Sequence, residues 1–117
     1  WDPFAWKSAE EEKSWEAFSA NGKPTLLPII QIILSRGPEA TLKWVDTVKS
    51  WDFERVIPAH LDAPLAIGPD QFAETFDWVR KGQNEVRYCD EDVALLRDAE
   101  KGILNFSVYK TPLGYLR

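Results

Sequence analysis

The chain has 117 residues, 44% of them hydrophobic and 28% charged, which is typical of one globular domain and not of a disordered protein. Its formal net charge of -5 disfavours a nucleic-acid partner, which would require a basic face, and also direct binding to anionic lipid. The single cysteine, Cys89, excludes an intramolecular disulfide. The longest apolar run, between residues 26 and 34, is far shorter than the ~20 residues that span a bilayer, so we expect no direct membrane span.

The first predicted helix covers residues 8–20, which are rich in Glu, Ala and Lys. Trp15 and Phe18, three residues apart, give this helix a narrow apolar stripe. Asn21-Gly22 is typical of the left-handed turn that ends a helix. We therefore expect a short helix with one apolar edge near the N-terminus.

Residues 24–36 fit two patterns. Pro28 at a first helical position and Gly37 just past the end favour a short helix, whereas the isoleucines at 29, 30, 32 and 33 would suit a strand. We predict the helix. Because it is apolar on all sides, it must be buried in the domain or covered by a partner.

A longer helix is predicted to begin at Pro38 and to end before Asp52. Apolar side chains recur at every third position along it, with Trp44 beside them, so we expect one wide face to pack in the core. Trp44 and Trp51 are both assigned to this core, and so is Trp78 further along the chain. The apolar residues of the face are Leu42, Val45, Val48 and Trp51.

Residues 55–57, Arg-Val-Ile, form the best strand candidate, bounded by Pro58. A loop is expected from 59 to 68. A lone strand does not stabilise itself, because its backbone donors and acceptors need partners. Val56 and Ile57 should therefore pair with another segment of this chain or with a sheet supplied from outside it.

Two more helices are predicted. The first begins at Pro69 and ends at Gly82. The second begins at the acidic run 90–92, since negative charge favours a helix N-terminus by a few tenths to ~1 kcal/mol per residue, and a tail begins at Gly102. The inward-facing residues are expected to be Phe72, Phe76 and Val79 in the first helix and Val93, Leu96 and Ala99 in the second.

The predicted fold is therefore mainly α, with one or two short β-strands, in a single domain of residues 1–117. Residues 1–22 form an N-terminal docking segment and helix, residues 23–104 the core, and residues 105–117 a C-terminal tail. Cys89 is predicted to be a small, buried apolar residue within this domain.

His60, the one histidine, follows the predicted strand, with the carboxylate of Asp62 two residues on. Enzymes built on a β-sheet place metal ligands at such positions. The alternative is a turn histidine whose side chain is hydrogen-bonded to the backbone. A catalytic zinc site uses three protein ligands, which one histidine and a distant cysteine do not supply, and no Gly-x-Ser-x-Gly nucleophile motif is present. We therefore predict a turn residue, and no catalytic residue, metal ligand or cofactor.

Six tryptophans are many for a chain of this length. Trp1, Phe4, Trp6 and Trp15 lie on a thin terminal segment that cannot bury all of them internally. Aromatic side chains are enriched among the anchors of protein interfaces. These four residues are therefore candidates for a docking surface, with packing back onto the domain as the alternative.

The segment Trp-Asp-Phe-Glu-Arg-Val-Ile-Pro-Ala-His at residues 51–60 is the most specific part of a resemblance that runs from about Trp6 to Leu104. The chain resembles an uncharacterised domain-of-unknown-function family of plants, algae and cyanobacteria that is related to the metallo-β-lactamase fold. The resemblance implies the C-terminal remnant of that α/β fold, with His60 where a late metal-ligand histidine falls. Further segments that carry it are residues 27–31, 37–40, 63–64 and 68–69.

The resemblance also implies a photosynthetic setting, and hence a chloroplast or other plastid. The absence of methionine indicates a processed product, a fragment or the ordered part of a longer protein. We expect a non-catalytic structural or interaction subunit, peripheral to a larger complex such as a membrane-embedded photosystem with its antenna. The alternative is the C-terminal portion of a metal-dependent hydrolase whose N-terminal half is absent from this chain, with His60 and Asp62 completing a metal site.

Overall fold

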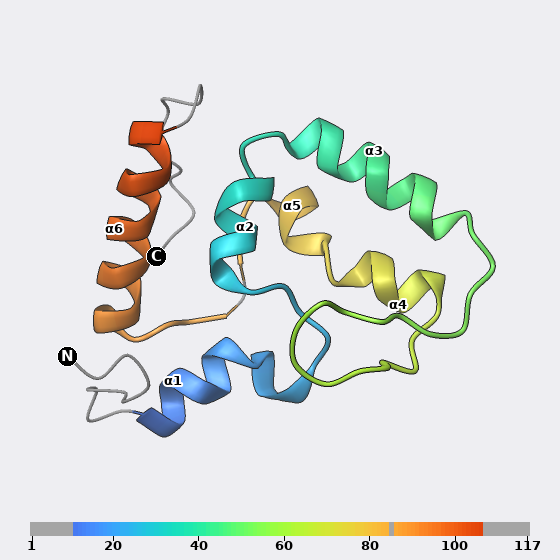
Figure 1. Ribbon diagram of the computed structural model, residues 1–117, viewed down its shortest axis with the longest axis horizontal. Coiled ribbons are helices and arrows are strands. Elements are labelled where there is room, and N and C mark those ends of the chain that lie inside the picture. The colour runs from blue at the N-terminus through green and yellow to red at the C-terminus, as the bar shows by residue number, and fades with distance from the viewer. Residues whose placement is uncertain (1–10, 85, 107–117) are drawn as a thin grey trace.

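The structure is a computed structural model that describes residues 11–84 and 86–106 (Figure 1). This part of the chain is mainly helical, as predicted. A long loop separates α3 from α4, and the other connections are shorter. The elements are α1 (Glu11–Phe18), the 3-10 helix η1 (Ala20–Gly22), α2 (Pro28–Leu34), α3 (Pro38–Lys49), α4 (Pro69–Glu74), α5 (Asp77–Lys81) and α6 (Asp90–Phe106).

The main core lies between α3 and the pair α4 and α5. α3 packs against both of these helices. Val45 of α3 and Phe76, between α4 and α5, are 0% and 2% exposed and form its centre. The other members are buried Ala73 and Val79, with partly buried Leu26, Leu34, Leu42, Phe72 and Trp78 around them.

The helix predicted over residues 69–82 is two helices, α4 and α5. The Thr75 hydroxyl donates to the Phe72 carbonyl oxygen at 2.6 Å and so competes for an acceptor of the helical ladder. Phe76 leaves helical geometry, with φ -108° and ψ 8°, and turns into the core. The predicted inward direction of Phe76 is confirmed, and Gly82 follows α5 with a left-handed φ of 67°.

α2 is helical, as predicted, with Pro28 in its first turn. Figure 1 shows α2 between α6 and the core helices, and α2 packs against α6. Ile32 is fully buried, whereas Ile30 and Ile33 are 38% and 48% exposed. The domain therefore covers only part of this apolar helix.

α6 starts at the predicted acidic run and extends farther than expected. Val93 is buried and Leu96 and Ala99 are half-buried, which confirms the predicted inward face. The helix continues through Gly102 to Phe106, so the tail predicted from Gly102 is wrong over this stretch. One glycine costs a helix only about 0.5–1 kcal/mol, too little to end it there. No helix in the described ranges is both long enough and apolar enough for a bilayer span, in line with the expectation.

The loop between α3 and α4 contains the predicted strand only in rudimentary form. Val56 and Leu65 make an isolated antiparallel bridge, with backbone N–H···O distances of 3.0 and 2.8 Å. Proline at 58 and 64 provides no N–H group to continue the ladder. The partner of Val56 is therefore the far side of its own loop, and the strand predicted over residues 55–57 is reduced to one residue.

Candidate interaction surface

Two tryptophans, one in the middle of α3 and one just past its end, lie on the surface. Trp44 is 49% exposed and Trp51, just past the helix, is 59% exposed, so the prediction that both belong to the core is wrong. α3 buries Thr41, Val45 and Val48 instead. At about 100° per residue, the two tryptophans lie within about 20° of each other and about 70–90° from the middle of that buried stripe. We call this pair the α3 aromatic face.

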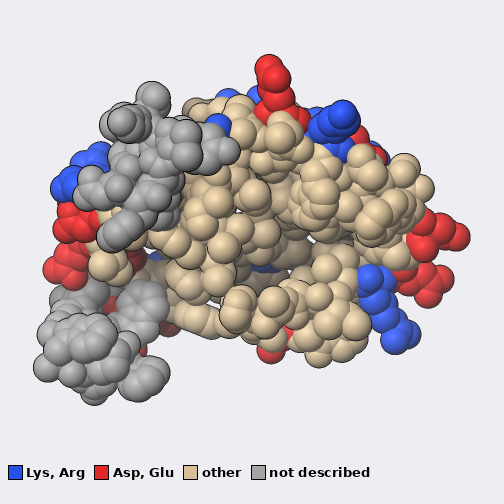
Figure 2. All heavy atoms as spheres, turned by 45° about the horizontal axis from the view of Figure 1, so that its top comes forward, with Lys and Arg blue, Asp and Glu red and all other residues tan. Residues whose placement is uncertain are grey.

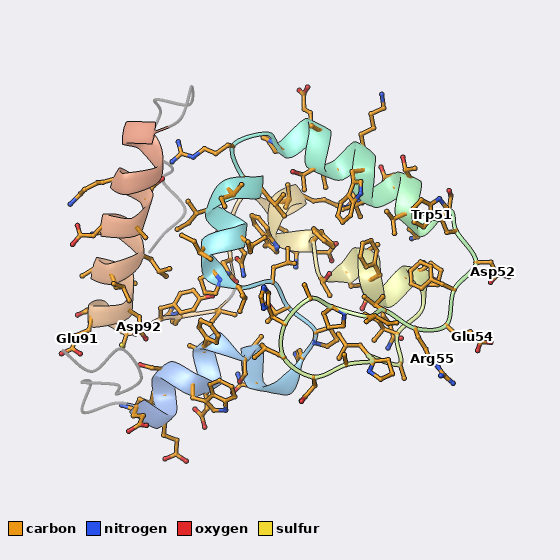
Figure 3. All side chains as sticks on the ribbon, in the orientation of Figure 1. Trp51, Asp52, Glu54, Arg55, Glu91 and Asp92 are labelled. Carbon is orange, nitrogen blue, oxygen red and sulfur yellow. The ribbon has the colours of Figure 1, made fainter. Side chains whose placement is uncertain are left out.

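The two indoles are held differently. Trp44 makes edge-to-face contacts with Phe72 and Phe76, at centroid distances of 5.7 and 5.5 Å. Phe72 also contacts Phe53 of the loop at 6.0 Å. Each such pair contributes about 0.5–1.5 kcal/mol beyond the burial of area. Trp44 is thus anchored to the edge of the core, whereas Trp51 lies in the turn that follows the helix (Figure 3).

The turn after α3 carries Trp51 together with charged residues. The backbone N–H of Trp51 donates to the Val48 carbonyl oxygen at 3.0 Å, which continues the helical hydrogen bonding of α3 by one turn. Figure 3 shows Asp52, Glu54 and Arg55 directed outward at this edge of the molecule. The edge therefore combines an exposed indole with charges of both signs.

Two exposed ion pairs fasten α3 to its neighbours. Lys49 pairs with Asp70 of α4 at 2.8 Å, and Asp46 with Arg80 of α5 at 2.9 Å. The hydrogen bond to Asp70, together with the charge of that carboxylate, raises the pKa of Lys49. Exposed pairs add little stability, so they mainly orient α3. Figure 2, with the α3 side turned forward, shows charged side chains around the rim of a broad uncharged face.

Trp15 belongs to α1, which lies away from α3 (Figure 1). It is 52% exposed and stacks on Phe18 at 6.3 Å. α1 buries its small residues Ser14 and Ala17, and not the predicted aromatic stripe, because small side chains allow close approach. The docking candidates that lie outside the described residues are Trp1, Phe4 and Trp6.

The start of α6 is joined to α1 through Cys89. Its Sγ lies 3.3 Å from Ser14 Oγ, and its S–H donates to Asp92 Oδ2 at 3.0 Å. Cys89 is half-buried and Ser14 is 1% exposed. The prediction of a small, buried apolar cysteine is therefore wrong, since the side chain is only half-buried and the thiol bridges two helices by hydrogen bonds.

A buried amide, Gln31, organises the segment that leads to α6. Its Nε2 donates to the Leu26 carbonyl at 2.8 Å, and its Oε1 accepts from Asn84 Nδ2 at 2.7 Å. The Tyr88 side chain is hydrogen-bonded to the side-chain amides of both Gln31 and Asn84. Burial raises the pKa of Tyr88, and these hydrogen bonds oppose the rise only in part. The network joins α2 to Asn84 and Tyr88.

Arg36, just after α2, forms a buried ion pair with Glu100 of α6. The Nη2–Oε1 distance is 2.7 Å, and the two side chains are 5% and 8% exposed. A buried pair adds little net stability, but removal of one partner leaves a charge in a poorly solvated place. The pair therefore sets the position of α6 on α2 more than it strengthens the fold.

The tip of the α3–α4 loop carries His60 and Asp62, and both are exposed. Leu61 between them has a φ of 65° and is 68% exposed, so the tip is a tight turn. In residues 11–84 and 86–106, no three histidine, cysteine or carboxylate side chains come together as a potential metal site. His60 and Asp62 could supply two ligands at most from this turn.

These features define a small helical domain that presents aromatic side chains on one helix. The chain matches the family described as Domain of unknown function (DUF4336) over residues 1–78, and it belongs to this family. The match confirms the resemblance to a family of unknown function, although it ends earlier than the expected Leu104. Trp44, Trp51 and His60 lie within the matched part, and α6 lies beyond it. No curated protein and no solved structure matches the chain.

Proposed function

We propose that the chain is a non-catalytic interaction subunit of a larger assembly and that it docks through the α3 aromatic face. The observation that carries the proposal is the exposure of Trp44 and Trp51, at 49% and 59%. Tryptophan is among the residues most enriched at interface hot spots, because its large ring loses much water-exposed area on binding.

The setting of the two indoles also favours docking. Trp44 lies on α3, which is anchored in the core, and is braced by Phe72 and Phe76, while Trp51 lies in the turn directly after α3. Little side-chain entropy of Trp44 remains to be lost when the α3 aromatic face is covered. The braced indole of Trp44 is therefore better suited to binding than a flexible surface residue would be.

We further propose that the assembly is a plastid photosystem with its antenna. We also propose that the domain descends from the metallo-β-lactamase-like α/β fold. The support for both is the sequence resemblance centred on residues 51–60. In this proposal the chain is peripheral to a membrane-embedded complex, and the Val56–Leu65 bridge is what remains of a sheet edge. A second contact would come from Trp1, Phe4, Trp6 and Trp15.

The proposal is tested by separating native complexes from cells that express the full gene product. The chain should migrate at fixed stoichiometry with one large pigment–protein complex. Trp51→Ala should lower its occupancy by about 10-fold or more, since loss of a hot spot costs about 2 kcal/mol. Leu95→Ala removes another exposed apolar residue, 70% exposed on α6, and should have no effect. A chain that migrates alone, or two variants with equal effects, would contradict the proposal.

The alternative is the C-terminal portion of a metal-dependent hydrolase. The exposed positions of His60 and Asp62 at the loop tip would let them meet ligands from another segment. Metal analysis of the longest native form separates the two proposals. Stoichiometric zinc or iron that is lost in His60→Ala would support the hydrolase, whereas a metal-free chain in a stable complex would support the docking subunit.

A further inference from the structure

α6 is attached to the domain without belonging to its main core. Among the residues whose side chains are described, the core cluster draws on α3, α4, α5 and the segment around α2, and none of its members comes from α6. α6 packs against α2 instead, at one end of the molecule (Figure 1). It also lies beyond residues 1–78, the part that matches the family. The match ends inside α5, and the core residue Val79 also lies beyond it, so it is the packing that separates α6 from the core.

Several of the described contacts that hold α6 are polar. The thiol of Cys89 bridges Ser14 and Asp92 at the start of the helix, and Glu100 pairs with Arg36 further along. When a helix lifts away, such groups regain hydration, so they favour the closed position less than apolar contacts of the same size would. Among the α6 side chains that the structure describes, those of Val93, Leu96 and Ala99 provide the apolar contacts.

We infer that α6 is a cover that opens from α2 as a unit while the α3–α5 core stays folded. Parts of a protein with few apolar contacts open at a smaller free energy than the whole domain unfolds. Opening frees Arg36 and Glu100 from each other and exposes both to water. The inference concerns α2 and α6 and is independent of the α3 aromatic face.

Opening has a consequence for α2. Ile32 is fully buried but lies outside the main core cluster, and α6 is the helix against which α2 packs most extensively. Ile30 and Ile33 are already partly exposed on the same helix. With α6 lifted, α2 presents a continuous apolar surface. The closed position of α6 therefore keeps buried an apolar surface that is distinct from the α3 aromatic face.

The single cysteine makes opening measurable, because Cys89 reacts with a disulfide reagent such as DTNB faster when the start of α6 leaves α1. Glu100 lies eleven residues further on, about 16 Å along the helix axis at 1.5 Å per residue. Glu100→Gln removes the counter-charge that lies 2.7 Å from Arg36. We expect Cys89 labelling in the native protein to be faster by about 10- to 100-fold. Hydrogen exchange of the α3 amides, measured on the same samples, should not change.

Asp98→Asn is the matched control. It breaks the exposed Asp98–Lys101 pair on the same helix, at 74% and 73% exposure, and should leave the labelling rate unchanged. Faster labelling in Glu100→Gln with unchanged α3 exchange supports the cover. Unchanged labelling overturns it. Faster exchange in α3 and α6 together also overturns it, because the chain would then unfold as one unit.

A second variant keeps the inference testable if Glu100→Gln does not fold. Arg36→Met combined with Glu100→Leu replaces the ion pair by apolar side chains of similar length, which should hold α6 closed more tightly. Cys89 labelling in this folded double variant should be at or below the rate of the unmodified chain. A faster rate would refute the inference.

Discussion

Replacing each tryptophan of the α3 aromatic face by alanine should show that Trp44 contributes more to the stability of the fold than Trp51 does. Trp44 and Trp51 are 49% and 59% exposed, so the loss of buried area is similar for the two substitutions and nearly cancels in a comparison. The difference that remains is the pair of edge-to-face contacts from Trp44 to Phe72 and Phe76. At about 0.5–1.5 kcal/mol each, they should make Trp44→Ala less stable than Trp51→Ala by about 1–3 kcal/mol.

Urea unfolding followed by far-ultraviolet circular dichroism measures this difference. With a slope of about 1–3 kcal/mol/M, the midpoint of Trp44→Ala should lie roughly 1 M below that of Trp51→Ala. Trp15→Ala is a useful third variant, because Trp15 is 52% exposed and has one stacked contact, with Phe18. Its midpoint should fall between the other two. Equal midpoints for Trp44→Ala and Trp51→Ala would refute the argument that the phenylalanines anchor Trp44.

Three further predictions concern the core, the buried tyrosine and the loop. Phe76→Ala should lower the free energy of unfolding by about 3–5 kcal/mol, since Phe76 is 2% exposed, and a loss under about 1 kcal/mol in a denaturant titration would contradict its central place. The pKa of Tyr88 is raised in the folded chain, so the unfolded chain ionises first and stability should fall as pH rises above about 10. Tyr88→Phe should flatten that fall in unfolding experiments across alkaline pH, and an unchanged slope would count against the burial of Tyr88. His60→Ala should change stability by no more than about 0.5 kcal/mol because the residue is exposed, and a large drop in thermal midpoint would show that the loop tip has a structural role.

The starts of the helices could be predicted because their signals are local. Pro28, Pro38 and Pro69 each lie in the first turn of a helix, where a missing N–H costs nothing. The left-handed end at Asn21-Gly22 is likewise set by residue type, with φ values of 54° and 76°. Signals of this kind do not depend on how the helices later pack.

The direction of the tryptophans could not be predicted from a spacing of three. Nine residues separate Leu42 from Trp51, and at about 100° per residue they lie half a turn apart. A stripe that keeps to one face must mix spacings of three and four, as Thr41, Val45 and Val48 do. The residues predicted for the core face therefore turn progressively away from the core toward the C-terminal end of α3.

The contacts that position α6 could not be predicted from local sequence patterns either. Arg36 and Glu100 are 64 residues apart, and Ser14 and Cys89 are 75 apart. Neither pair has a sequence pattern of its own, because each depends on where two helices come to lie. The network of Gln31, like these pairs, becomes visible only once the packing is known.

The Val56–Leu65 bridge closes the ends of a segment whose residues 59–64 are all exposed. The entropic cost of closing a loop rises only slowly with the length of the loop. Exposed loop tips also tolerate inserted sequence better than packed segments do. A short peptide epitope spliced in at Leu61 should therefore leave the helices in place. It would provide a handle for immobilising the protein in an orientation chosen independently of its termini.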